Sequence, residues 1–116
     1  MFGLIEGSML AIPGNARIFL CQRPMNMRRS FEGLSADVEK LFPGELLSGA
    51  LFAFFNRNRD HIKVLFWDKD GLVIWYKRLE KGSFGKWGHE ITLDRRGFLM
   101  LLEGVIPQKI SPRFSL

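Results

Sequence analysis

Three runs rich in apolar, β-branched and aromatic residues follow one another in the middle of the chain. Runs of this composition, bounded by polar turn residues, are typical of β-strands. Two compact polar turns separate them, and the second turn ends in Asp70-Gly71, a strong hairpin signal. Connections this short require antiparallel neighbours. The pattern predicts a β-meander within about residues 50–88, with strands at 50–55, 62–67 and 72–79.

Apolar residues recur at spacings of three and four between Met27 and Leu41, which is the period of an amphipathic helix. Asn26 is the expected N-cap, and Pro43-Gly44 ends the segment. Glycine at position 33 costs helix stability unless another group packs closely against it. We therefore expect a first helix over about residues 26–42.

A second helix is expected over about residues 93–104, capped by Thr92 or Asp94 and ended by Gly104. A short apolar strand is expected at 17–21, and an edge strand is expected to begin at Trp87. The expected fold is therefore α+β, in which a small antiparallel sheet of three to five strands packs with two main helices.

The length of 116 residues predicts a single domain, with residues 1–12 and 106–116 peripheral or loosely ordered. The one cysteine, Cys21, excludes an internal disulfide and a cysteine-based zinc finger. No run is long enough to span a membrane, and the first twelve residues lack the basic start of a signal peptide. These observations predict a cytoplasmic protein with no cofactor.

The net charge is +5, which favours polyanionic partners such as DNA. Residues 50–88 hold eight Lys or Arg against four Asp or Glu, so they carry four of these five charges. Tryptophans lie between the cations: a sheet face with Lys63, Lys77, Trp67 and Trp75 would hold a phosphate backbone and stack bases. The alternative is that the tryptophans belong to the core and the lysines form its rim.

Arg28 and Arg29 extend this basic pattern, although pairing with Glu32 on the same helix explains them equally well. The candidate nucleic-acid-binding residues are Arg28, Arg29, Arg57, Arg59, Lys63, Lys77, Arg78 and Lys81.

Signals for catalysis are weak. His61 and Asp60 are adjacent and form a pair that is capable of acid–base chemistry, but the pattern implies no nucleophile beside them. A metal-dependent nuclease would use Asp60, Asp68, Asp70 and Glu80, yet these carboxylates are expected at turns on opposite ends of the sheet. No enzyme and no metal site are therefore expected.

The second helix contains Phe98-Leu-Met-Leu-Leu102, which is apolar on nearly every side. Such a helix is buried on more than one face, either under other elements or against another chain. This pattern gives a second functional hypothesis, a protein adaptor. Its candidate partner-binding residues are Phe98, Met100 and Leu101.

Three blocks of the chain together resemble a known family: Asn26-Met-Arg-Arg-Ser-Phe-Glu-Gly-Leu34, the stretch from Gly49-Ala-Leu-Phe-Ala-Phe-Phe-Asn-Arg57 through 60–71 and 75–82, and 93–104 with its Leu-Leu-Glu-Gly ending. In these blocks the chain resembles the TnpB accessory proteins of the bacterial insertion-sequence family numbered sixty-six. Asn26 stands where that family usually has aspartate, Ser30 where it has glycine, and Gly97 where it prefers helix formers.

This resemblance implies an accessory protein of transposition that works beside a separate DDE-type transposase, and it implies no catalytic activity. DNA, including the element's ends, and the transposase or another accessory protein are the expected partners. Self-association is left open. Three readings follow: a DNA-binding factor, an adaptor for the transposase complex, and a metal-dependent nuclease.

Overall fold

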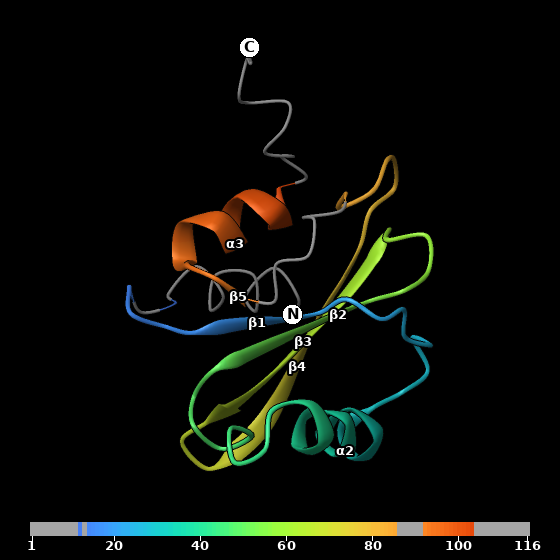
Figure 1. Ribbon diagram of the computed structural model, residues 1–116. Helices are drawn as coiled ribbons and strands as arrows, with labels where there is room; N and C mark the ends of the chain where they lie inside the picture. Colours follow the sequence, from blue (N-terminus) through green and yellow to red (C-terminus); the bar gives the residue numbers. More distant parts are fainter. Residues whose placement is uncertain (1–11, 13, 86–91, 104–116) are drawn as a thin grey trace.

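A mixed sheet with a helix on each face forms the centre of the molecule (Figure 1). The computed structural model describes residues 12, 14–85 and 92–103. The sheet has five strands in the order β4-β3-β2-β1-β5. Its elements, in chain order, are β1 (Ile18–Cys21), α2 (Phe31–Leu41), β2 (Leu51–Phe55), β3 (His61–Asp68), β4 (Gly71–Arg78), β5 (Thr92–Leu93) and α3 (Arg95–Leu102).

The predicted α+β class and the β2–β3–β4 meander are confirmed. The sheet is not wholly antiparallel, because β1 pairs with β2 in parallel. Parallel neighbours need a long crossover connection, and the segment 22–50, which includes α2, provides it. Strand β5 pairs antiparallel with the other edge of β1, where the sequence analysis had placed the start of a helix at Leu93. The edge strand predicted at Trp87 lies outside the described residues.

Alternation along the strands divides the core into two layers, one on each side of the sheet. On the α3 side, Ile18, Phe55 and Val64 pack with Phe98 and Leu101. On the α2 side, Phe52, Phe54 and Leu65 pack with Leu34 and Val38. Figure 1 shows α3 above the sheet and α2 below it, so a helix covers each face. Residues 1–12 and 106–116 were predicted to be peripheral. Of these, the structure describes only Ile12, which lies in the α3-side core.

Helix α2 begins later than predicted, after Ser30 and not after Asn26. The Asn26 side chain accepts a hydrogen bond from the backbone N–H of Arg28 at 2.8 Å, which forms a separate turn. The carbonyls of Met27 and Arg29 accept hydrogen bonds from the Lys63 ammonium, which holds this segment against the sheet before the helix begins. The predicted apolar stripe is also shorter: Leu34 and Val38 are buried, whereas Phe31 is 45% exposed and Leu41 is 54% exposed.

Helix α3 is capped as predicted by Asp94, whose side chain accepts a hydrogen bond from the N–H of Gly97 at 2.7 Å. The predicted end at Gly104 lies outside the described residues. The β3–β4 hairpin is also confirmed, but its positive φ of 59° falls at Lys69 and not at Gly71. The reason is the register: Asp68 pairs with Gly71, so Lys69 and Asp70 are the two loop residues.

Candidate nucleic-acid interface

Three connecting segments meet at the end of the sheet where β1, β2 and β4 end and β3 begins. The segment 22–30 is joined to β2 by a hydrogen bond from the N–H of Met25 to the carbonyl of Phe55 at 2.8 Å. The loop 79–85 is joined to the turn 56–60 by a bond from the N–H of Phe84 to the carbonyl of Arg59 at 2.7 Å. We call these three segments, with the strand ends beside them, the basic end.

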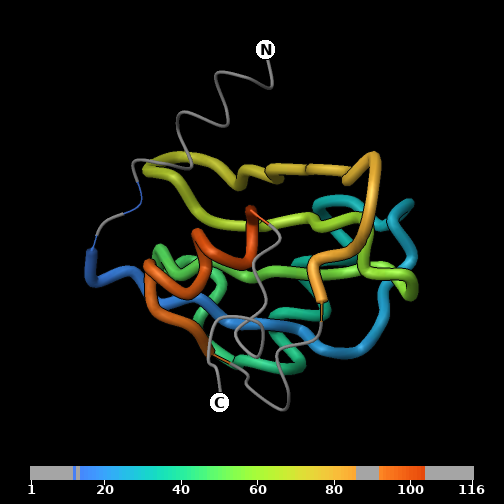
Figure 2. Tube along the Cα trace, turned by 90° about the horizontal axis from the view of Figure 1, so that it is seen from above, coloured from blue at the N-terminus to red at the C-terminus, as the bar shows by residue number. Residues whose placement is uncertain are grey.

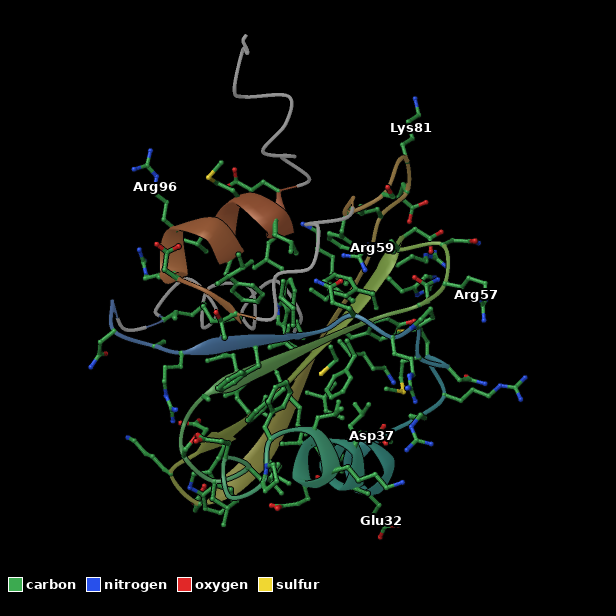
Figure 3. All side chains as sticks on the ribbon, viewed as in Figure 1. Glu32, Asp37, Arg57, Arg59, Lys81 and Arg96 are labelled. Atoms are coloured by element: carbon green, nitrogen blue, oxygen red, sulfur yellow. The ribbon has the colours of Figure 1, made fainter. Side chains whose placement is uncertain are left out.

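Five cations of the basic end are exposed. Figure 3 shows two of them, Arg57 and Lys81, projecting away from the sheet on the same side of the molecule. Arg78 lies 3.4 Å from Glu80, but both side chains are largely exposed, so this ion pair is weak and the cation stays accessible. We call these residues the rim cations: Arg23, Arg28, Arg57, Arg78 and Lys81.

Arg23 was not among the sequence-predicted site residues. It stands directly before Pro24, two residues after the end of β1. Arg23 reaches the basic end because β1 and β2 are parallel neighbours, so the residues that follow β1 lie beside the end of β2. Predicting this position requires knowledge of the β1–β2 pairing, which the local sequence pattern does not contain.

Lys63 is turned inward at the basic end and is only 9% exposed. Its ammonium donates to the carbonyls of Met27 at 2.6 Å and Arg29 at 2.8 Å, and it lies 5.0 Å from the ring centre of Tyr76. Burial lowers the pKa of Lys63 below its ordinary value. The two carbonyls compensate for the lost hydration of the ammonium, so Lys63 holds the segment before α2 against the sheet.

Arg59 is also turned inward and is 7% exposed. It has a positive φ of 57°, its guanidinium lies 4.0 Å from the ring centre of Phe55, and its Nε donates to the carbonyl of Gly85. Burial lowers its pKa. Its Nη2 is buried without a hydrogen-bond partner in the described part of the chain. Arg59 therefore ties the turn 56–60 to the loop 79–85.

Arg29 and Lys77 are engaged as well. Arg29 forms a bidentate pair with Asp37, with Nε–Oδ2 and Nη2–Oδ1 distances of 3.0 Å, and not the predicted pair with Glu32. Its guanidinium also packs against Gly33, which explains why glycine is tolerated within α2. Lys77 lies on the other side of the sheet and donates to the carbonyl of Leu102 at the end of α3, at 3.2 Å. A cation is favourable there because of the helix dipole.

The predicted sheet face with two lysines and two tryptophans does not exist. Cross-strand pairing places Lys63 and Trp67 on the α2 side, but it places Trp75 opposite Val64 and Lys77 opposite Ile62 on the α3 side. Trp75 is 4% exposed and belongs to the core, whereas Trp67 is half-buried. The prediction failed because strand alternation was applied to each strand separately, without the register that joins them.

A side-chain cluster lies beside the rim cations on the α2 side of β3 and β4. The Nδ1 of His61 is 2.6 Å from the hydroxyl of Tyr76, and its Nε2 is 3.9 Å from Asp60. A shallow depression of about 240 Å³ is lined by Tyr76 and Arg78. The His61–Asp60 pair is evident in the sequence because the two residues are adjacent, whereas Tyr76 reaches His61 only through the pairing of β3 with β4.

Helix α3 offers little of the surface expected for an adaptor. Phe98 and Leu101 are fully buried against the sheet, so they present no area to a partner. Met100 is half-buried and packs against the same core. Leu102 is also buried and Leu99 is partly buried against this core, so the apolar side chains of α3 contribute mainly to the interior of the chain.

The four carboxylates considered for a metal site are divided between opposite ends of the sheet, with Asp60 and Glu80 at one end and Asp68 and Asp70 at the other. Asp60 precedes β3, whereas Asp68 ends it and Asp70 follows in the next turn. A strand of eight residues is roughly 25 Å long, so these groups cannot converge on one ion. Within residues 12, 14–85 and 92–103, no three His, Cys, Asp or Glu side chains gather as metal ligands. In the same part of the chain, no helix has the length and apolar composition needed to cross a bilayer.

Comparison with known proteins identifies the family. Residues 16–112 match the family described as "IS66 Orf2 like protein". The uncharacterized protein y4hO of Sinorhizobium fredii is 32% identical over 101 residues, which cover 84% of this chain and 87% of that protein. The uncharacterized protein y4jC of the same organism is 31% identical over 68 residues, which cover 59% of this chain and only 58% of that protein. No solved structure matches. The chain therefore belongs to the IS66 Orf2-like family, and it is an accessory protein of insertion-sequence transposition.

Proposed function

We propose that the chain binds DNA through the rim cations of the basic end, without a catalytic step of its own. The observation that supports this most strongly is the gathering of five exposed cations at one end of the sheet, on segments that are far apart in sequence. Phosphate groups are the natural ligands of such a surface, because contacts from Arg and Lys release the counterions of the DNA. The family context supplies DNA as the substrate of the process.

The covered faces of the sheet favour one mode of binding. A platform that stacks unpaired bases needs open aromatic side chains, but Trp75 is buried and a helix covers each face. Contacts from the rim cations therefore go mainly to the sugar–phosphate backbone, and we expect modest sequence preference. With about three to five phosphate contacts, the logarithm of the association constant should fall with the logarithm of salt concentration with a slope of about −2.7 to −4.5.

The adaptor hypothesis is less well supported. Its predicted surface on α3 is mostly core, since Phe98 and Leu101 have no exposed area. An interaction with the transposase remains expected for an accessory protein of this family, but the described structure favours no particular residues for it. DNA binding is the function for which the geometry provides a defined surface.

The test is a titration of duplex DNA from the element's ends, and of a scrambled duplex, over a series of salt concentrations. Arg57→Glu and Lys81→Glu should each weaken binding to both duplexes by about tenfold at low salt and reduce the salt slope by about one. Arg96→Glu is the matched control: Arg96 is exposed on α3, and Figure 3 shows it on the opposite side of the molecule from Arg57 and Lys81.

The control removes the same charge from the whole protein, so it separates a local surface from general attraction. Equal losses for Arg57→Glu and Arg96→Glu would show that net charge alone drives binding. No binding at physiological ionic strength, or an affinity that does not change with salt, would overturn the proposal.

A further inference from the structure

Strand β4 forms one edge of the sheet. Its eight residues pair with β3, and no other described strand lies on its outer side (Figure 2). The other edge is formed by β5, which is only two residues long. The first half of β4 is apolar, and Leu72, Val73 and Ile74 are each partly exposed. A long unpaired edge of this kind is a template for another strand.

The register shows which backbone groups of β4 are available. Asp68 and Gly71 flank the two-residue loop, so they form a hydrogen-bonded pair, and such pairs alternate along an antiparallel ladder. The bond from the N–H of Leu79 to the carbonyl of Asp60 at 2.8 Å continues the same alternation beyond the strand. Odd-numbered residues therefore bond to β3, and the N–H and C=O groups of Leu72, Ile74, Tyr76 and Arg78 are directed outward.

We propose that this edge pairs with β4 of a second copy of the chain, in antiparallel orientation and with Ile74 opposite Ile74. The charges of the strand are complementary only in this orientation. Exposed Asp70 precedes the strand and exposed Arg78 ends it, so antiparallel pairing places Asp70 of each copy opposite Arg78 of the other. Parallel pairing in register would place Arg78 against Arg78, which is repulsive.

The side chains fit the same register. Leu72 faces Tyr76 of the second copy on the α2 side, and Val73 faces Trp75 of the second copy on the α3 side. Pairs of aromatic and aliphatic residues across strands are favourable. A register centred on Trp75 would place Asp70 opposite Glu80, which is repulsive. The charges therefore select the register centred on Ile74.

The product is a continuous ten-stranded sheet with a two-fold axis at Ile74. Because the two copies run in opposite directions, their basic ends face opposite sides of the dimer. Pairing of one edge strand buries a small area, so we expect a dissociation constant in about the micromolar range. The dimer engages one rim cation, Arg78, in an ion pair and leaves the other four free for DNA. It needs no DNA to form, so it is measured without DNA and its failure is distinct from that of the DNA-binding proposal.

Sedimentation equilibrium across the micromolar range tests the proposal by charge exchange. Asp70→Arg places two like-charged pairs in the interface and should weaken the dimer by about tenfold. Arg78→Asp should do the same, and the two changes combined should restore dimerisation, because they recreate both ion pairs in reverse. Only a register that places these two residues opposite each other predicts this rescue.

A backbone variant supplies a second test. Ile74→Pro removes an outward N–H without removing a bond to β3, and edge strands tolerate proline. It should abolish the dimer while circular dichroism shows the same β content as the wild type. A wild-type monomer at all concentrations would overturn the proposal. A dimer that is insensitive to all of these changes would also overturn it, because it would use another surface.

Discussion

Arginine and lysine residues have two different roles at the basic end: some bond to groups within the fold, and others are exposed to solvent. The eight cations predicted to bind nucleic acid divide evenly: Arg29, Arg59, Lys63 and Lys77 bond to groups within the fold, whereas Arg28, Arg57, Arg78 and Lys81 are exposed. The inner four connect segments that are otherwise separate, and the outer four leave their charges in solvent. Counting all eight predicted cations therefore overestimates the number available to DNA about twofold. The other four, which bond within the fold, hold together the segments on which the exposed cations lie.

The difference has a simple physical cause. A cation that is withdrawn from solvent, wholly like Lys63 and Arg59 or partly like Arg29 and Lys77, is tolerated only where polar groups replace its lost water. Backbone carbonyls supply this for Lys63 and Lys77, a carboxylate supplies it for Arg29, and Arg59 combines a carbonyl with an aromatic ring. The exposed cations keep their water and make few contacts, so replacing them should affect partners more than stability.

The largest contrast between interior and rim should be seen in thiol reactivity. Cys21 lies in the interior, in the cross-strand row that continues through Phe54 to Lys63. Burial, and secondarily the charge of Asp37, raise the pKa of Cys21 to about 12. Because the thiolate is the reactive form, alkylation of the native protein at pH 8 should be at least about a thousandfold slower than alkylation of the unfolded chain.

A rim cysteine provides the matched control. In Cys21→Ala, Arg57→Cys introduces a thiol at an exposed position of the same end, and it should react at the rate of an ordinary exposed cysteine. The rate is followed by mass spectrometry with iodoacetamide. Rapid alkylation of native Cys21 would show that this side of the core opens readily, which would contradict the structural role assigned to the inner cations.

The next largest effect is expected from Lys63→Met. Methionine fills a similar volume but leaves the carbonyls of Met27 and Arg29 without their donor. The free energy of unfolding should fall by about 2 kcal/mol, as measured by urea denaturation. Lys81→Met removes an exposed lysine of the rim and should change it by less than about 0.5 kcal/mol. Similar losses in both variants would remove the distinction between interior and rim.

The partners of Lys63 show what the sequence could and could not predict. Its strand and the following hairpin were predicted from local pattern, and both are confirmed, whereas the face that Lys63 was predicted to share with Lys77 and Trp75 does not exist. Its bonds to Met27 and Arg29 join residues more than thirty positions apart, so no local pattern contains them. The start of α2 was placed too early for this reason, since a tertiary contact diverts the backbone before the helix.

Other differences also arise from long-range pairing. Strand β5 has two residues, too few for an alternating pattern, and it exists because β1 offers an edge. The parallel pairing of β1 with β2 brings Arg23 to the basic end. The candidate site was therefore predicted in its composition, but the division of its cations into inner and outer groups required the fold.

A smaller effect on stability than that of Lys63→Met is expected from Asp37→Asn. It is also the most direct way to convert an inner, bonded cation into an exposed one. This variant removes the bidentate partner of Arg29, whose side chain is 39% exposed, so the loss of stability should be only about 0.5–1 kcal/mol. It also releases a guanidinium at the basic end. If DNA binds there, affinity should rise by about two- to fivefold at low salt, with a smaller gain at high salt.

Glu32→Gln separates the two causes of that gain. Glu32 is exposed in the first turn of α2, near Asp37 in the same helix, and Figure 3 shows both carboxylates. Its replacement removes the same charge but leaves the Arg29–Asp37 pair intact. A larger gain for Asp37→Asn than for Glu32→Gln, in the same DNA titration, would show that a released inner cation acts as a rim cation. Equal gains would mean that only the total charge of this end matters, because releasing Arg29 would then add nothing.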